Sequence, residues 1–221
     1  MPSEARKAFD KNASDIEKLL KLHKQHSGTN RGRRHGLEVL NKSAIVLITS
    51  FWEAYCEDIA AEGLEHIVTH SNDSKVLPKE LKKQIAKELN KDPNELAIWE
   101  LSGEGWRQIL KKQLETLKEE RNKHLNTPKS TNIDDLFLKA IGISNISNTW
   151  KWVTTMTPVR ARKKLDTYVQ LRGAIAHRGK TSKSVTKKNV TDYFEFIKKL
   201  AARTGGEVNN HVKDVTGKAL W

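Results

Sequence analysis

Apolar residues recur at spacings of three and four along almost the whole chain, and this helical period limits the folds open to it. The pattern is longest between about Leu37 and Val68, where the segment AIVLI is apolar nearly all round and indicates a central, buried helix. No stretch of the sequence alternates apolar and polar residues as a half-buried strand does. The sequence therefore predicts an all-α helical bundle with a long central helix and extra short helices.

Turn and capping residues divide the rest of the chain. The pattern predicts a first helix ending near Ser27-Gly28, short helices over 78–89, 92–103 and 133–141, and a longer one over 106–121. Thr157-Pro158 is a typical N-cap and first-turn pair, so we expect a helix from there to Arg178, with Gly179 as its C-terminal stop. We expect a last long helix from about Lys187 to Ala202, broken by Gly205-Gly206 and followed by a weaker helix.

The sequence contains no feature that would divide the chain into separate domains. No linker or internal repeat divides its 221 residues, so we expect one domain over 1–221, with a core over 36–200 and a C-terminal helical extension over 201–221. The longest apolar run, Ala44 to Trp52, is about half of the ~20 residues that a membrane span needs. Cys56 is the only cysteine, which excludes an intrachain disulfide and a multi-cysteine zinc site. With no apolar signal core at the N-terminus, we expect a cytoplasmic protein.

Positive charge is concentrated in one part of the chain. The net charge is +13, and the stretch from Lys151 to Thr191 carries eleven Lys or Arg against one acid, Asp166. Basic surfaces often serve only solubility, but a local concentration of this kind favours a polyanion partner such as RNA. The residues that we expect to contact RNA are Lys163, Lys164, Arg178, Lys180, Lys183, Lys187 and Lys188.

Arg172 interrupts the apolar face of the helix that Thr157-Pro158 opens. It falls on the same stripe as Leu165, Val169 and Ile175. A guanidinium in such a position is costly unless it is paired or opens onto a groove or interface. His177 lies five residues further on, about 140° around the helix, so a two-fold axis is one way to bring the two types of side chain into one groove.

Arg172 and His177 form the pattern Arg, four residues, His near the end of a late helix, and this pattern resembles the signature of the HEPN superfamily. The resemblance extends to the segments KSAIVLITSFWEAYCEDIA, LNTPKSTNIDDLFLKAIGI, with the tryptophans after it, and ARKKLDTYVQLRGAIAHRG, which look like the RiboL-PSP-HEPN branch. It covers the chain from about Gly36 to Leu200 and implies a HEPN-type helical bundle.

Many HEPN proteins are dimeric, metal-independent endoribonucleases, and the resemblance implies a homodimer and RNA cleavage without a metal or other cofactor. His177 would be the general acid or base and Arg172 the phosphate clamp. Catalytic members usually carry a polar residue directly after the Arg, where this chain has Gly173. That departure leaves open a non-catalytic, dimeric RNA-binding or protein-interaction module. A helix-turn-helix DNA-binding protein is disfavoured, because the basic residues flank a loop after a long helix.

Other candidate residues have structural interpretations beside the functional ones. Glu53, Glu57 and Asp58 are either surface acids or the source of an ion-pair partner for Arg172, which would make that Arg structural. Glu62, His66 and His70 share a helix face, but a solvated face is the simpler interpretation than a metal site. Trp150 and Trp152 either fill the core or stack on bases. Cys56 is expected to be inert.

Overall fold

The computed structural model describes residues 2–27, 37–119, 125, 127–179 and 184–221, and over these ranges the chain is helical without a strand. The predicted all-α fold is confirmed. The helices are α1 (Glu4–Ser27), α2 (Glu38–His70), α3 (Lys79–Leu89), α4 (Gly105–Glu119), α5 (Ser130–Ile141), α6 (Pro158–Arg178) and α7 (Lys187–Thr216). Three short 3₁₀ segments lie between them, η1 (Ser74–Val76), η2 (Ala97–Leu101) and η3 (Ile146–Thr149).

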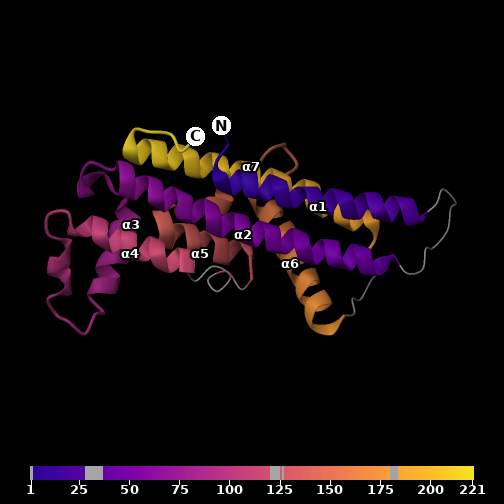
Figure 1. Cartoon of the computed structure of the whole chain (residues 1–221), viewed down its shortest axis with the longest axis horizontal. Helices are drawn as coiled ribbons and strands as arrows, with labels where there is room; N and C mark the ends of the chain where they lie inside the picture. The colour runs from indigo at the N-terminus through magenta and orange to yellow at the C-terminus, as the bar shows by residue number, and fades with distance from the viewer. Residues whose placement is uncertain (1, 28–36, 120–124, 126, 180–183) are drawn as a thin grey trace.

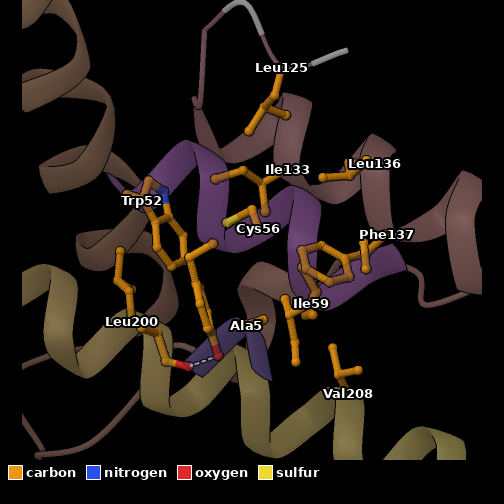
Figure 2. Packing of buried hydrophobic residues seen from close by; sticks show 14 of the residues in the cluster. Ala5, Trp52, Cys56, Ile59, Leu125, Ile133, Leu136, Phe137, Leu200 and Val208 are labelled. Carbon is orange, nitrogen blue, oxygen red and sulfur yellow. Dashed lines mark hydrogen bonds between the residues drawn. The ribbon is translucent and has the colours of Figure 1, made fainter. Parts of the chain in front are cut away.

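Helix α2 is the central element of the bundle, as its apolar pattern predicts. It packs against α1, α4, α5, α6 and α7. Figure 2 shows side chains of α2, among them Trp52, Cys56 and Ile59, lying between α5 on one side and α7 on the other. A helix enclosed on several sides needs apolar residues nearly all round, which explains the AIVLI segment.

The other helices are distributed along the length of α2. In Figure 1, α1 and α7 run along one side of α2, and α3, α4 and α5 gather on the other side. Helix α6 crosses the bundle, and its last turns project beyond the remaining helices. Burial follows the same trend, because Ala161, Leu165 and Val169 are buried while no later residue of α6 is.

Two expectations about local structure are wrong. Residues 92–103 do not form an α-helix; only the 3₁₀ segment η2 is found there. Gly205-Gly206 does not end the last helix, since α7 continues to Thr216. The reason is packing: a Cβ atom at Gly205 would overlap the Tyr55 hydroxyl of α2, so the absence of a side chain allows close approach of the two helices. The Tyr55 hydroxyl donates to the carbonyl of Ala201 (2.8 Å), and the contact offsets the usual cost of glycine in a helix.

Candidate functional site

Local capping signals determine where α6 begins and ends. The Thr157 hydroxyl accepts a hydrogen bond from the Arg160 N–H (3.4 Å), and Pro158 occupies the first turn. At the other end Gly179 has φ 60°, and its N–H donates to the carbonyl of Ile175 (3.0 Å). The predicted start and stop of this helix are both confirmed.

The first turns of α2 hold the end of α6 and the start of α7. Lys42 Nζ donates to the carbonyl of Gly179 (3.0 Å), and Asn41 Nδ2 donates to the carbonyl of Val185 (2.9 Å). Asn41 is buried, so this hydrogen bond is shielded from water. The helix end that carries His177 is therefore attached to the central helix on the side of Gly179.

Arg172 is half-buried and turned toward α2 and α7. Its guanidinium is close enough to Glu53 of α2 and Tyr193 of α7 to influence the ionisation of both. Arg172 Nε is buried and has no hydrogen-bond partner among the described residues. A buried donor without a partner is costly, so contacts within the described chain do not account for the position of Arg172.

Glu53 is the acid that faces Arg172. Burial raises the pKa of Glu53 to about 7, the Arg172 guanidinium opposes that rise, and Glu57 adds to it. Among the described residues no ion pair within 4.0 Å joins Glu53 to Arg172. Glu57 is engaged elsewhere, because its Oε1 accepts from the N–H of Leu125 (3.2 Å). The described geometry therefore contains no close ion pair between Arg172 and Glu53.

His177 lies in the last turn of α6 and is exposed. In the described part of the chain, no hydrogen bond joins His177 to Arg172. Within one chain, Arg172 is therefore turned toward the edge of the core, and His177 is open to solvent. Gly173, which follows Arg172, has nothing within 4 Å of the position that a Cβ atom would take.

The lysines and arginines predicted to bind RNA differ in their surroundings. Lys163, Arg178 and Lys188 are exposed, but Lys188 is paired with Asp192 (3.1 Å). Lys164 is half-buried, with Nζ 4.8 Å from the centre of the Phe196 ring, and loss of solvent lowers its pKa. Lys187 is half-buried at the start of α7.

Two of the predicted contacts, Lys180 and Lys183, lie outside the described residues. The one acid of the basic stretch, Asp166, has a structural role. Its carboxylate accepts from the backbone N–H (2.9 Å) and hydroxyl (3.1 Å) of Ser130, which fastens α6 to the first residue of α5.

The two tryptophans beside the basic stretch have different roles. Trp150 is fully buried, its Nε1 donates to the Thr204 hydroxyl (3.0 Å), and its ring meets Trp52 edge-on at 6.0 Å. The suggestion that Trp150 stacks on bases is therefore wrong. Trp152 is half-buried against Phe196, with Lys199 Nζ 5.8 Å from its ring centre.

The possible metal site on α2 has structural explanations for its members. The Glu62 carboxylate accepts from the N–H groups of Glu4 (2.9 Å) and Ala5 (3.0 Å), which satisfies the first turn of α1. His66 Nε2 is 2.9 Å from the carbonyl oxygen of Lys218. Within the described ranges no three His, Cys, Asp or Glu side chains are grouped as metal ligands.

Burial raises the pKa of the Cys56 thiol well above its usual value, in keeping with the expected inert cysteine. Of the helices in the described ranges, none combines the length and apolar character needed to span a bilayer.

The comparisons with known proteins bear on the family of this chain. Comparison with curated proteins and with solved structures gives no match. The family model described as RiboL-PSP-HEPN matches residues 10–210, a range that includes most of α1 and all of α2 to α6. The chain belongs to the RiboL-PSP-HEPN family.

Proposed function

We propose that the protein is a metal-independent endoribonuclease that acts as a homodimer, with Arg172 and His177 in its active groove. Family membership supports an RNA-related role. The observation that carries the proposal is the state of Arg172. Its buried Nε has no partner in the described chain, and the helix that holds it ends in an exposed His177. We place this activity in the cytoplasm, in a microbial defence or RNA-damage system.

The chemistry needs only proton transfer and charge stabilisation. The RNA 2′-oxygen forms a bond to the adjacent phosphorus, and the bond from phosphorus to the 5′-oxygen breaks. The 2′-OH proton passes to a base and the leaving 5′-oxygen receives a proton, so the products are a 2′,3′-cyclic phosphate and a 5′-OH. His177 would carry one of these protons, and Arg172 would stabilise the charge on the phosphate oxygens.

A dimer supplies what one chain does not. After Val169 the residues of α6 are half-buried or exposed, including the apolar Leu171 and Ile175. Packing this half of α6 against its symmetry mate would cover them and would bring Arg172 of one subunit toward His177 of the other. The exposed Lys163 and Arg178 on the same helix would then contact the RNA backbone on either side of the groove.

Gly173 favours a second candidate function, a non-catalytic dimeric module that binds RNA or a protein. The residue contributes no side chain to orient His177 or a phosphate. Under this alternative Arg172 still contacts phosphate, but no bond is broken. RNA binding alone does not distinguish the two functions, whereas the chemical nature of the RNA ends does.

The decisive experiment incubates the purified protein with a structured RNA in EDTA and analyses the products. The nuclease proposal expects cleavage to persist and to leave cyclic phosphate ends. Mixing the Arg172→Ala and His177→Ala variants then tests the shared site. If each site takes Arg from one subunit and His from the other, half of the chains pair as mixed dimers with one intact site each, so about a quarter of the activity returns. RNA that is bound but never cut would establish the non-catalytic function instead.

A further inference from the structure

A groove of about 690 Å³ is lined by residues of α4 and α5, with the end of α3 and η2 at one end of it. Its apolar floor is formed by Leu89, Ile109, Leu117, Leu136 and Ala140. The side chains of Arg172 and His177 do not line it. We refer to this feature as the α4–α5 groove.

Two helices form the long walls of the groove. The residues of α4 that line it begin at Ile109 and end at Leu117, and those of α5 begin at Asn132 and end at Ala140. On each helix they are spaced by three and four, so each wall is one continuous helix face. Both helices pack on α2, and a hydrogen bond from Gln113 Nε2 to the carbonyl of Lys139 (2.9 Å) joins the two walls. A furrow between two helices that rest on a third has the shape that receives another helix.

The charge of the groove is opposite to that of the whole chain. Four carboxylates and two lysines line it, whereas the chain has a net charge of +13. One carboxylate, Asp135, is already paired with Lys139 (2.6 Å). The other three, Glu88, Asp92 and Glu100, are exposed at the end formed by α3 and η2, and among the described residues none of them forms an ion pair.

Exposed apolar side chains continue the surface beyond this acidic end. Trp99 is 71% exposed and Leu96 67% exposed, and both lie in or beside η2, the segment that contributes Glu100. Tryptophan is enriched among the residues that dominate protein–protein binding, and a side chain this exposed contributes little to the fold of its own chain.

The wall of the groove also contains an unsatisfied acceptor. Gln113 Oε1 is buried and has no hydrogen-bond donor among the described residues, although the Nε2 of the same amide is used. A lysine or arginine side chain of a bound group is a suitable donor, and it reaches this acceptor once the Gln113 side chain turns toward the groove.

We propose that the α4–α5 groove, together with Trp99, binds a basic amphipathic helix of a partner protein. The apolar face of that helix lies on the floor between α4 and α5. Its lysines or arginines meet Glu88, Asp92 and Glu100, and an apolar residue beyond the groove packs on Trp99. The groove is independent of the Arg172 site, so one chain can hold RNA and a protein partner at the same time.

The test uses the full chain and two fluorescently labelled peptides of about 18 residues with the same helical leucine pattern. One peptide has lysine and the other glutamate at its polar positions, and binding is measured by fluorescence anisotropy. The net charge of the protein favours the glutamate peptide. The groove proposal expects the opposite order, with the lysine peptide binding more tightly.

A matched pair of double variants locates the binding. Glu88→Lys with Glu100→Lys reverses two acids of the groove, and we expect it to weaken binding of the lysine peptide about 10-fold or more. Glu17→Lys with Asp214→Lys makes the same change in net charge on α1 and α7, away from the groove, and leaves binding unchanged. Trp99→Ala also weakens binding, while the melting temperature stays the same because the side chain is exposed.

Three results would overturn the proposal: neither peptide binds, the glutamate peptide binds more tightly, or the two double variants behave alike. The two double variants make the same change in net charge and leave Arg172 and His177 in place. Both should therefore cleave RNA and bind RNA to the same extent. Failure of the nuclease proposal would therefore leave this test intact.

Discussion

Glu53 of α2 faces Arg172 of α6 at the edge of the core without forming a close ion pair with it. Burial raises the pKa of the Glu53 carboxyl to about 7, even though the guanidinium opposes that rise. Near neutral pH the carboxyl is therefore partly protonated and neutralises Arg172 incompletely. The positive charge of Arg172 stays available for a phosphate, which a fully ionised partner in contact would prevent.

The Glu53 carboxyl makes stability depend on pH. Its pKa in the folded protein, about 7, is above the value of about 4.3 in an unfolded chain, so the folded state holds the proton more tightly. The contribution of this group to the free energy of unfolding is therefore largest below about pH 4 and is lost as the pH rises toward 7. Glu53→Gln removes that dependence. The free energy of unfolding of the variant, relative to that of wild type, should increase by on the order of 1 kcal/mol from pH 5 to pH 8. This value is reduced for solvent screening of the half-exposed carboxyl.

Urea unfolding of wild type and Glu53→Gln at both pH values measures this gain, and the comparison cancels the titration of all other groups. A stability difference that is the same at pH 5 and pH 8 would show that Glu53 has an ordinary pKa in the folded protein.

Arg172→Ala and His177→Ala should remove catalysis without unfolding the protein. A general acid–base group contributes about 100- to 10,000-fold, and loss of one donor that stabilises transition-state charge costs about 100- to 1,000-fold. Either substitution is therefore expected to lower the cleavage rate by at least 100-fold. His177 is exposed, and its removal should change the free energy of unfolding by less than about 0.5 kcal/mol. Arg172→Ala should cost no more than about 1 kcal/mol, because no close ion pair to Glu53 is lost.

Thermal unfolding followed by circular dichroism checks both stabilities. If Arg172→Ala instead loses several kcal/mol while His177→Ala has no effect on RNA, Arg172 is a structural residue and the nuclease proposal fails.

Gly173→Asn should increase cleavage. The position has free space, since nothing lies within 4 Å of the point that a Cβ atom would occupy, and it adjoins Arg172 on the helix. An amide there can hold a phosphate oxygen or orient His177, which we expect to raise the rate about 10-fold. Gly173→Ala is the control, because it makes the same change in backbone freedom without the polar group. Single-turnover rates at saturating RNA separate the two variants, and equal rates would mean that a polar residue after Arg172 has no role in this chain.

Local capping signals made the two ends of α6 predictable from the sequence. Features that depend on long-range packing were not predictable in this way. Thr157, Pro158 and Gly179 act on their own neighbours, so both ends of the helix follow from the sequence. The continuation of α7 through Gly205 depends on Tyr55, which is 150 residues away in the chain. The burial of Trp150 likewise depends on Trp52 and Thr204, which no local pattern connects to it.

The sequence likewise predicted only part of the candidate site. The position of Arg172 on an apolar stripe marks it in the sequence, because a charged side chain on such a face is costly unless it has a partner or faces a groove or interface. Which of the three acids on α2 faces it depends on how α6 crosses α2, and the structure identifies Glu53. The α4–α5 groove gives no sequence signal, since each wall alone looks like an ordinary amphipathic helix.

RNA binding should weaken with salt, and charge reversal on α6 should reduce the salt dependence. Lys163 and Arg178 are exposed and unpaired among the described residues. Reversing both removes about two phosphate contacts, and the slope of log K against log salt should become shallower by roughly 1.4 for single-stranded RNA. Lys188→Glu should have a smaller effect, because Asp192 already neutralises that lysine. Lys87→Glu on α3 is the control, and filter binding over a range of salt concentrations gives each slope. An unchanged slope in the Lys163/Arg178 variant would place the RNA on another surface.

The two adjacent glycines of α7 should respond to alanine in opposite directions. A Cβ atom at Gly205 overlaps the buried Tyr55 hydroxyl, so Gly205→Ala must move a side chain that donates to the Ala201 carbonyl. We expect a loss of about 1 to 3 kcal/mol in the free energy of unfolding. Gly206 has nothing within 4 Å of the same position, so Gly206→Ala should gain about 0.5 to 1 kcal/mol from helix propensity. Urea unfolding of the two single variants measures both values with the same chemical change one residue apart. If both substitutions were stabilising, α7 would not approach α2 closely at Gly205, and packing against Tyr55 would no longer explain why the helix continues past these glycines.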